Sequence, residues 1–283
     1  MKKNDLRRRL EDGLVVAPGA PDSLSARMVQ QAGFPAVYMT GLGATAIRLG
    51  MPDIGLLSQT EMAEHARNMV RAVNIPVIAD ADNGYGGISN IERTVQEYEQ
   101  AGVAAFHLED QVSPKKCGQM AGIQLMPAAD SAGRIKSAVA ARQHEDLMVI
   151  GRTDALGVAG IDEALRRAES YLEAGADLAF VDGVKSLEHV EQISRRLDGP
   201  KVLAIVAGTE PERLTLSEVE ELGFSMVLYP MDVLFSYLAA ATATLEHLRS
   251  TGVSAGGPHP WHYGDFSDTV GLSHHQELER AFT

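Results

Sequence analysis

The chain has 283 residues, of which 45% are hydrophobic and 22% charged, and its formal net charge is −13 at pH 7. This composition is typical of a water-soluble globular protein, and the acidic balance argues against non-specific binding to nucleic acid, which needs a basic face. We expect a cytoplasmic protein, because the sequence has no apolar run long enough for a membrane span, its basic start lacks the apolar region of a signal peptide, and its single cysteine excludes an intramolecular disulfide.

Eight short apolar runs recur along the chain and read as strands that are covered on both faces. They are VVAPGA (15–20), AVYMTG (36–41), PVIADAD (76–82), AAFHLED (104–110), LMVIGRTD (147–154), LAFVDG (178–183), KVLAIVAG (201–208) and MVLYP (226–230). Amphipathic stretches with helical spacing lie between them. Eight strands that alternate with helices over about 230 residues predict an α/β protein with a (β/α)8 barrel, and a doubly wound open sheet is the alternative.

Local signals punctuate these helices. Three starts carry a capping-box pattern: Ser58 with Glu61, Ser89 with Glu92, and Thr215 with Glu218. Four ends carry a glycine just before the next strand: Gly33, Gly102, Gly175 and Gly223. The repetition indicates one helix–glycine–strand unit used several times.

The C-terminal part differs from this pattern. The chain becomes rich in glycine and proline between Gly252 and Pro260, and then returns to helical spacing with Trp261 near its start. We therefore expect a barrel domain over residues 1–250, followed by a linker and helical tail over residues 251–283. A tail on such a linker often packs on a neighbouring subunit, which favours a homo-oligomer.

Acidic residues stand at the ends of neighbouring predicted strands, where the active site of a barrel lies. Asp80 and Asp82 are two residues apart, so that on a strand they would point to the same face, and Glu109 ends the next strand. Three carboxylates at one rim predict a site for Mg²⁺, with Mn²⁺ as a substitute. The alternative is that the aspartates cap the loop that follows them.

Two further side chains at this rim suggest chemistry. Arg152 ends the fifth strand and would bind a carboxylate or phosphoryl group of a substrate, unless it pairs with Glu109 or Asp154. Cys117 lies in a long connection, residues 111–126, which has the length of a functional lid. We expect Lys115 and Lys116 to lower the pKa of the thiol and Gly118 to let the lid close, although a lone cysteine can also be inert packing.

The segments DADNGYGG, HLEDQVSPKKCGQ, GRTDA and APGAPDSLSARMVQQAGFPAVYMTG resemble the isocitrate lyase/phosphoenolpyruvate mutase superfamily over about residues 10–245. The resemblance implies a (β/α)8 barrel whose last helix is often swapped between the subunits of a dimer or tetramer. It also implies a bound Mg²⁺ and a small 2-oxo or 2-hydroxy carboxylic acid as substrate. A cysteine in the lid is typical of the carbon–carbon lyases of the superfamily, although one of its phosphorus–carbon mutases also has it.

The resemblance also assigns roles to individual residues. Asp80 would ligate the metal directly, with Asp82, Glu109 and Asp53 as outer acids. Substrate carboxylate would be held by Tyr38 and Arg152 together with the segment that contains Thr40, Gly41, Leu42 and Gly43. Cys117 would protonate the departing carbanion, and Lys116, Gly118 and Gln119 would complete the site from the lid.

Three departures bear on the substrate. Gln119 stands where the lyases typically have histidine, Asp182-Gly183 stands where Glu-Ala is frequent, and residues 204–212 lack the usual Asn and Glu-Gly-Gly-like turn. Substrates with three carboxylates are therefore disfavoured. We expect a Mg²⁺-dependent carbon–carbon lyase of the 2-methylisocitrate or 2,3-dimethylmalate type. The alternatives are an oxaloacetate decarboxylase or hydrolase, a phosphorus–carbon mutase, and a barrel that binds a 2-oxo acid without turnover.

Overall fold

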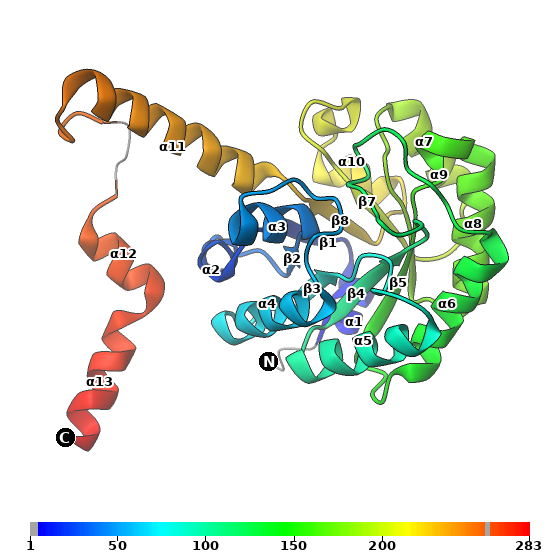
Figure 1. The fold of residues 1–283 in the computed structure, drawn as a ribbon, viewed down its shortest axis with the longest axis horizontal. Coiled ribbons are helices and arrows are strands. Elements are labelled where there is room, and N and C mark those ends of the chain that lie inside the picture. Colours follow the sequence, from blue (N-terminus) through cyan, green and yellow to red (C-terminus); the bar gives the residue numbers. More distant parts are fainter. Residues whose placement is uncertain (1–4, 258–260) are drawn as a thin grey trace.

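The computed structural model describes residues 5–257 and 261–283, and its body is a closed barrel of eight parallel strands in sequential order, β1 to β8 (Figure 1). Each strand hydrogen-bonds to the next, and β8 closes the barrel onto β1. The strands are β1 Val15–Ala20, β2 Val37–Met39, β3 Val77–Asp80, β4 Ala105–Glu109, β5 Met148–Thr153, β6 Leu178–Val181, β7 Lys201–Ala204 and β8 Met226–Tyr229. The predicted (β/α)8 barrel is confirmed, and each strand lies within one of the eight predicted runs.

Helices cover the outside of the barrel and connect successive strands (Figure 1). Those up to β5 are α1 Leu6–Asp12, α2 Ser23–Gln31, α3 Gly41–Leu49, α4 Gln59–Ala72, α5 Ile88–Ala101 and α6 Ala128–Ala141. Those between β5 and β8 are α7 Leu156–Ala159, α8 Ile161–Glu173, α9 Leu187–Arg196, the 3₁₀ turn η1 Glu210–Arg213 and α10 Leu216–Glu221. The C-terminal ones are α11 Asp232–Thr251, α12 Tyr263–Val270 and α13 Leu272–Phe282.

Two of the three predicted capping boxes are confirmed. The side chains of Ser58 and Thr215 each accept a hydrogen bond from the backbone three residues later, and the glutamates there bond back. The third is wrong, because α5 begins at Ile88 and not after Ser89. Its first turn is closed by the Asn90 side chain, which accepts a hydrogen bond from the Gly87 amide. A glycine therefore occupies the cap position.

The alternation of side chains along each strand decides what reaches the barrel interior. In β4, Ala105 belongs to the cluster inside the barrel and Phe106 to the cluster under the helices. His107 and Glu109 therefore share the inward face, since side chains repeat every two residues along a strand. Cross-strand register then places His107 beside Asp80 and Glu109 beside Arg152. The interior is apolar at its bottom and polar at the C-terminal ends of β3 to β6.

The long helix α11 leaves the barrel and runs outward, and α12 and α13 follow it (Figure 1). Leu234, near its start, is the buried residue of α11. The chain then returns, because α12 packs on α2 and the Gln31 side chain donates a hydrogen bond to the Thr269 carbonyl at 3.4 Å. The end of the predicted linker, residues 258–260, lies outside the described residues. Of the helices formed by the described residues, none is long and apolar enough to cross a membrane.

Candidate active site

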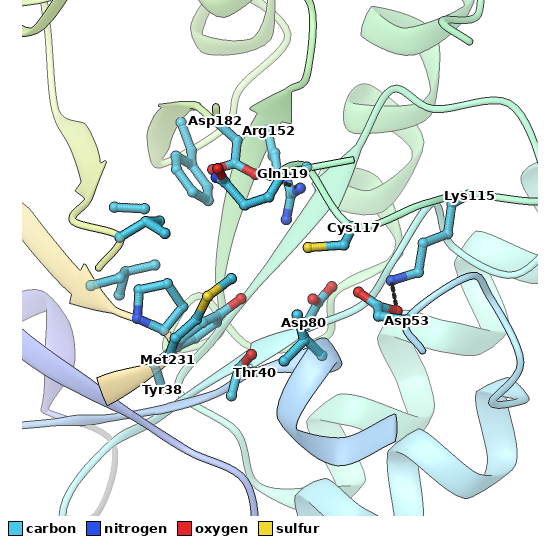
Figure 2. Close-up of a pocket in the computed structure, with 17 residues that line it drawn as sticks. Tyr38, Thr40, Asp53, Asp80, Lys115, Cys117, Gln119, Arg152, Asp182 and Met231 are labelled. Carbon is cyan, nitrogen blue, oxygen red and sulfur yellow. Dashed lines mark hydrogen bonds and ion pairs between the residues drawn. The ribbon is translucent and has the colours of Figure 1, made fainter. Parts of the chain in front are cut away.

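A cavity with an empty volume of about 480 Å³ lies at the C-terminal ends of the strands, under the lid (Figure 2). Most of the residues singled out in the sequence line it. The lining consists of Tyr38, Thr40, Leu42, Asp53, Asp80, Lys115, Cys117, Gly118, Gln119, Arg152, Phe180, Asp182, Ala204, Val206, Leu228, Pro230 and Met231.

Arg152 enters this cavity from the end of β5 and is surrounded by carboxylates. Its Nη2 lies 2.6 Å from Asp182 Oδ2, 2.8 Å from Asp154 Oδ1 and 3.5 Å from Glu109 Oε2. Although burial lowers it, these carboxylates raise the pKa of the guanidinium well above its usual value. The sequence left open whether Arg152 pairs with acids of the protein or faces a substrate. In the structure, Arg152 pairs with acids of the protein and also lines the cavity.

Asp80 lies at the centre of the polar rim. Its Oδ2 accepts a hydrogen bond from the Gly41 amide at 3.2 Å, and its Oδ1 accepts one from the Asp82 amide at 2.9 Å. Burial raises its pKa, but His107, Lys115 and Arg152 outweigh this and hold the pKa of Asp80 at about 2. Asp80 is therefore a carboxylate at neutral pH.

Asp82 lies near Asp80 because of a turn in the backbone, and not because the two residues share one face of a strand as expected. Strand β3 ends at Asp80, so the two side chains do not share a strand face. Asp82 has a φ of 47°, in the left-handed region, and its Oδ1 lies 2.6 Å from Lys115 Nζ. The turn is held from outside by Arg134 on α6, whose guanidinium donates to the Asn83 and Gly86 carbonyls.

The acids of the rim outnumber its cations. The buried carboxylates are Asp53, Asp80, Asp82, Glu109, Asp154 and Asp182, and the buried cations among them are Lys115 and Arg152. Burial raises the pKa of Asp82 to about 6 and that of Glu109 well above its usual value. Glu109 Oε1 is buried and has no hydrogen-bond partner among the described residues. A cation would relieve this excess of negative charge.

The donor set fits Mg²⁺, which prefers oxygen ligands and keeps several of its waters. Within the described part of the chain, no three His, Cys, Asp or Glu side chains are arranged to ligate one ion together. In the arrangement that the resemblance implies, one carboxylate would ligate the ion directly and outer acids would support it. Asp80 would be the direct ligand, with Asp82 and Glu109 behind it. Lys115 Nζ pairs with Asp53 at 2.5 Å as well as with Asp82 at 2.6 Å, so both of these acids also hold the lid.

The lid runs from the end of β4 to α6 and is fastened over the cavity. Lys115 is only 4% exposed and bridges Asp53 and Asp82. The Cys117 amide donates to the Asp53 carbonyl at 3.0 Å. Lys116 does not line the cavity, since its Nζ donates to the Gly122 carbonyl at 3.1 Å. The lysine that belongs to the site is therefore Lys115, and the expectation for Lys116 is corrected.

The Cys117 thiol projects from the lid into the cavity, between Arg152 and Asp80 (Figure 2). Burial raises its pKa to about 11, although a hydrogen bond from the Gln119 backbone opposes this. The expected lowering of the thiol pKa by the lysines is wrong. The Lys115 ammonium is occupied by two carboxylates, and Lys116 points elsewhere. Cys117 is a protonated thiol at neutral pH, which suits a proton donor.

Gly118 and Gln119 bring the lid down onto the Arg152 cluster. A Cβ at Gly118 would collide with the Asp182 carboxylate and would lie 2.9 Å from Arg152 Nη2. Glycine is therefore required there by the close approach of the lid. The Gln119 side chain lies beside Arg152 and Asp182 (Figure 2).

Tyr38 and the start of α3 form the opposite side. Tyr38 Oη lies 2.8 Å from His107 Nε2, and His107 is fully buried. In the first turn of α3, the Gly41 amide bonds to Asp80 and the Gly43 amide to the Thr40 hydroxyl. Among the described residues, no hydrogen bond is recorded for the Leu42 amide, which lies in the first turn at the positive end of the helix dipole.

The remaining wall is apolar and, apart from Leu42, was not predicted from the sequence. It is built by Leu42, Phe180, Ala204, Val206, Leu228, Pro230 and Met231. Most of these residues continue the inward-facing positions of β6, β7 and β8. The same two-residue alternation also points His107 into the interior. That periodicity was the signal that could have identified both the wall and His107.

Comparisons with known proteins identify the family of the chain and its relatives. A family model described as phosphoenolpyruvate phosphomutase matches residues 6–249. The chain is 41% identical over 270 residues to the 2,3-dimethylmalate lyase of Eubacterium barkeri, covering 95% of this chain and 93% of that protein. It is 38% identical over 239 residues to a 2-methylisocitrate lyase of Aeropyrum pernix, covering 84% of this chain and 77% of the relative.

Solved structures show the same fold with related chemistry. An oxaloacetate acetylhydrolase in complex with 3,3-difluorooxalacetate superposes with a TM-score of 0.92 at 34% identity, covering 99% of this chain and 96% of that one. A phosphonopyruvate hydrolase in complex with oxalate and Mg²⁺ superposes with a TM-score of 0.89 at 30% identity, covering 100% and 99% of the two chains.

Proposed function

The chain belongs to the phosphoenolpyruvate phosphomutase family, within the superfamily that also contains the isocitrate lyases, and it is a carbon–carbon lyase. We propose that it cleaves a small alkyl-substituted 2-hydroxy dicarboxylic acid to a 2-oxo acid. The proposed substrate is of the 2,3-dimethylmalate type. The reaction is a retro-Claisen cleavage that depends on Mg²⁺.

The observation that carries this proposal is the protonated thiol of Cys117 on a closed lid, opposite the carboxylate cluster. Carbon–carbon cleavage of such an acid leaves a carbanion that must receive a proton. A thiol with a pKa of about 11 keeps its proton at neutral pH and points into the cavity. Lid closure keeps bulk water from competing for the carbanion.

The apolar wall supports a substrate with alkyl groups. The cationic side chains that line the cavity, Lys115 and Arg152, are both on its polar side. A third carboxylate against Val206 or Met231 would lose its hydration without gaining an ionic partner, which is unfavourable. Methyl groups would instead bury apolar surface, which contributes about 0.8 kcal/mol for each carbon. The wall therefore favours a dimethylmalate-type acid over the tricarboxylate 2-methylisocitrate.

Other residues of the cavity would bind the substrate carboxylate, bind the metal and allow the lid to close. Arg152 and the Leu42 amide hold substrate carboxylate from opposite sides. Asp80, supported by Asp82 and Glu109, would hold Mg²⁺, which when bound supplies positive charge that stabilises the developing enolate. Gly118 lets the lid settle on the Arg152 cluster, so that the Cys117 proton lies within the closed site.

The test is turnover by the purified protein with Mg²⁺ across a panel of substituted malates and 2-methylisocitrate, with the released 2-oxo acid as the readout. We expect the highest kcat/KM with malates that carry methyl groups, and loss of activity when the metal is chelated. Absence of turnover on the whole panel would refute the proposal.

A second reaction at the same site is hydrolysis of oxaloacetate, which the likeness to the oxaloacetate acetylhydrolase supports. In this reaction water would add to the 2-keto carbon of oxaloacetate and the bond between carbons 2 and 3 would break, which releases oxalate and, once the departing carbanion has received a proton, acetate. Measuring oxalate release from oxaloacetate, in the same buffer and with Mg²⁺, decides between the two. A kcat/KM for oxaloacetate above that of every malate would assign the chain to hydrolysis.

We also propose that the protein is a homo-oligomer assembled through α11 and the tail, residues 251–283, beyond a barrel of residues 1–250. Five large side chains on α11 are exposed: Phe235, Tyr237, Leu238, Leu245 and Leu248. Apolar surface of this extent marks an interaction site. Light scattering should give the mass of a dimer or tetramer, and Leu238→Glu with Leu245→Glu should reduce it. A monomeric wild-type protein at micromolar concentration would overturn this assignment.

A further inference from the structure

Asp110 is a buried acid to which the proposed reaction gives no task. It follows Glu109 directly at the end of β4, it is 1% exposed, and it does not line the cavity. Its side chain points to the other side of the strand, where helix α8 covers the barrel. There its carboxylate accepts hydrogen bonds from the Thr153 hydroxyl at 2.6 Å, the Asp154 amide at 2.9 Å, Arg167 Nη1 at 3.0 Å and the Tyr171 hydroxyl at 2.8 Å. These four bonds use the full accepting capacity of a carboxylate.

Two of the four bonds fix the end of β5. The Asp154 amide donates to Asp110 Oδ1, and the Asp154 carboxylate accepts from Arg152 Nε at 3.2 Å and from its Nη2 at 2.8 Å. A bidentate pair of this kind fixes the plane of the guanidinium. The Thr153 hydroxyl, which donates to Asp110, also accepts from the Ala155 amide at 3.2 Å. Asp110 therefore holds, through the backbone of β5, the arginine that projects into the cavity (Figure 2).

The same acid fixes the base of the lid. Its backbone carbonyl accepts from the Met126 amide at 2.9 Å, so the residue before the lid is joined to the last residue of the lid. Arg167 Nη1, which bonds to the Asp110 carboxylate, also donates to the Met126 carbonyl at 3.0 Å. Both ends of the lid are thus attached to one point on α8, and the part that carries Cys117 lies beyond that point. We call this junction of Asp110, Met126 and Arg167 the hinge.

We propose that Asp110 is a positioning residue that joins Arg152 to the hinge, so that the guanidinium stays aimed into the cavity while the tip of the lid opens and closes. The tip contacts groups of the cavity through Lys115 and Gly118, whereas the ion pair of the hinge is buried between the barrel and α8. Opening can therefore break the first set of contacts and leave the second intact. The inference rests on the proposed function in that it takes Arg152 to bind the substrate and Cys117 to arrive with the lid.

The opposite end of β5 provides a matched control. Asp177 is also largely buried, with its side chain 9% exposed, and it also accepts from the backbone of β5, through the Val149 amide at 2.8 Å. It pairs with Arg142 at 2.7 Å and with Arg7 at 2.8 Å. None of these four residues lines the cavity or belongs to the lid. Asp177→Asn therefore removes a comparable set of bonds from the same strand without affecting the hinge.

The first test uses Cys117, the single cysteine of the chain, to report how often the lid opens. In Asp110→Asn, an amide replaces the carboxylate, so the hinge loses its negative charge and part of its accepting capacity. At pH 8 and without ligand, iodoacetamide should modify Cys117 about tenfold faster than in the wild type, because a loosened hinge raises the population of open lids. In Asp177→Asn the rate should change less than about twofold. An unchanged rate in Asp110→Asn, or an equal rise in both variants, would overturn the inference.

A milder variant keeps the test decisive if Asp110→Asn does not fold. Thr153→Val keeps the volume of the side chain and removes one of the four hydrogen bonds to Asp110. Alkylation of Cys117 should then be about fivefold faster, in line with the loss of one hydrogen bond. The Tm of each variant, measured by calorimetry, verifies that the compared proteins are folded at 25 °C. An unchanged alkylation rate in folded Thr153→Val would contradict the role of Asp110 at the hinge.

The second test observes Arg152 itself in protein labelled with ¹⁵N-arginine, where its Nε–H signal is the one absent from Arg152→Lys. Because that N–H is bonded to Asp154 Oδ2, its exchange with solvent is slow while Asp154 is held in place. The exchange should be about tenfold faster in Asp110→Asn and unchanged in Asp177→Asn. Equal exchange in all three proteins would refute the positioning of Arg152 by Asp110. Neither test needs turnover or a bound metal, so failure of the inference is distinguishable from failure of the proposed lyase activity, which the substrate panel measures.

Discussion

The polar and apolar sides of the cavity are built by different parts of the barrel. Strands β2 to β5 and the lid supply Asp80, Glu109, Cys117 and Arg152, whereas the ends of β6, β7 and β8 supply most of the apolar wall. The polar side holds charged groups in place by mutual ion pairs. The apolar side carries no charge with which to bind a carboxylate. In the proposed reaction, the polar side would perform the chemistry and the apolar side would select the acid.

The largest effect should come from the centre of the polar side. Replacing Asp80 by Ala removes the proposed direct metal ligand and the acceptor for the Gly41 amide. We expect kcat/KM to fall by about a thousandfold or more, since a metal supplies several kcal/mol of charge stabilisation. The Mg²⁺-induced rise in Tm should vanish as well. Asp146→Ala, an exposed aspartate, is the control. A loss of kcat/KM below tenfold for Asp80→Ala would contradict a metal site on the polar side.

The next effect should come from the lid. Cys117→Ser keeps the shape but replaces the thiol by a much weaker acid, so we expect kcat to fall by about two to three orders of magnitude. Binding of 2-oxo acid, measured by calorimetry, should stay within about threefold. Ser113→Ala, on the same lid but outside the cavity lining, serves as the control. If Cys117→Ser retains half of the activity, the proton comes from another group.

Alkylation of Cys117 tests the buried state of the thiol directly. Iodoacetamide attacks the thiolate, which is formed only as the pH rises towards the pKa. With a pKa of about 11, the reaction at pH 8 should be about two orders of magnitude slower than for a free cysteine, whose pKa is about 8.5. The rate should still increase with pH at pH 9 to 10. The urea-unfolded protein provides the reference rate, and equal rates in both states would mean an exposed, ordinary thiol.

The smallest effect should come from the apolar wall. Val206→Thr keeps the volume but places a hydroxyl against the substrate's alkyl groups. We expect kcat/KM to fall by about tenfold for 2,3-dimethylmalate, in line with a cost of about 1–2 kcal/mol for an unpaired hydroxyl. The value for unsubstituted malate should not change. Val158→Thr makes the same substitution at an exposed position and should affect neither substrate. Parallel losses on both substrates would place Val206 outside the specificity wall.

The fold and the rim of the site were accessible to sequence reasoning because both depend on short-range patterns. Apolar runs and glycine-terminated helices specify the barrel, and strand ends specify where Asp80, Glu109 and Arg152 meet. The lid was not accessible in the same way. The Gln111 side chain makes two 2.8 Å hydrogen bonds to the backbone of Lys116: its amide nitrogen donates to the carbonyl, and its amide oxygen accepts from the N–H. With the backbone held in this way, the Lys116 side chain points outward and the Lys115 side chain points inward. No spacing rule reveals such a contact.

The direction of the thiol pKa was missed for a related reason. Two lysines beside a cysteine suggest stabilisation of the thiolate, provided that their charges remain free. Here the Lys115 charge is matched by Asp53 and Asp82, which come from two other connections of the barrel. Burial then dominates the thiol, and its pKa rises. A sequence shows which charges are neighbours along the chain but not which are already neutralised in space.

The anchoring of the lid has a consequence for the timing of the reaction. Lys115 seats between Asp53 and Asp82, the Cys117 amide bonds to the Asp53 carbonyl, and Gly118 rests on Asp182, all within four consecutive residues. Opening of the lid must break these contacts together, so the lid moves as one unit. If Cys117 is the proton donor, as proposed, its thiol can enter the site only together with the lid that excludes water.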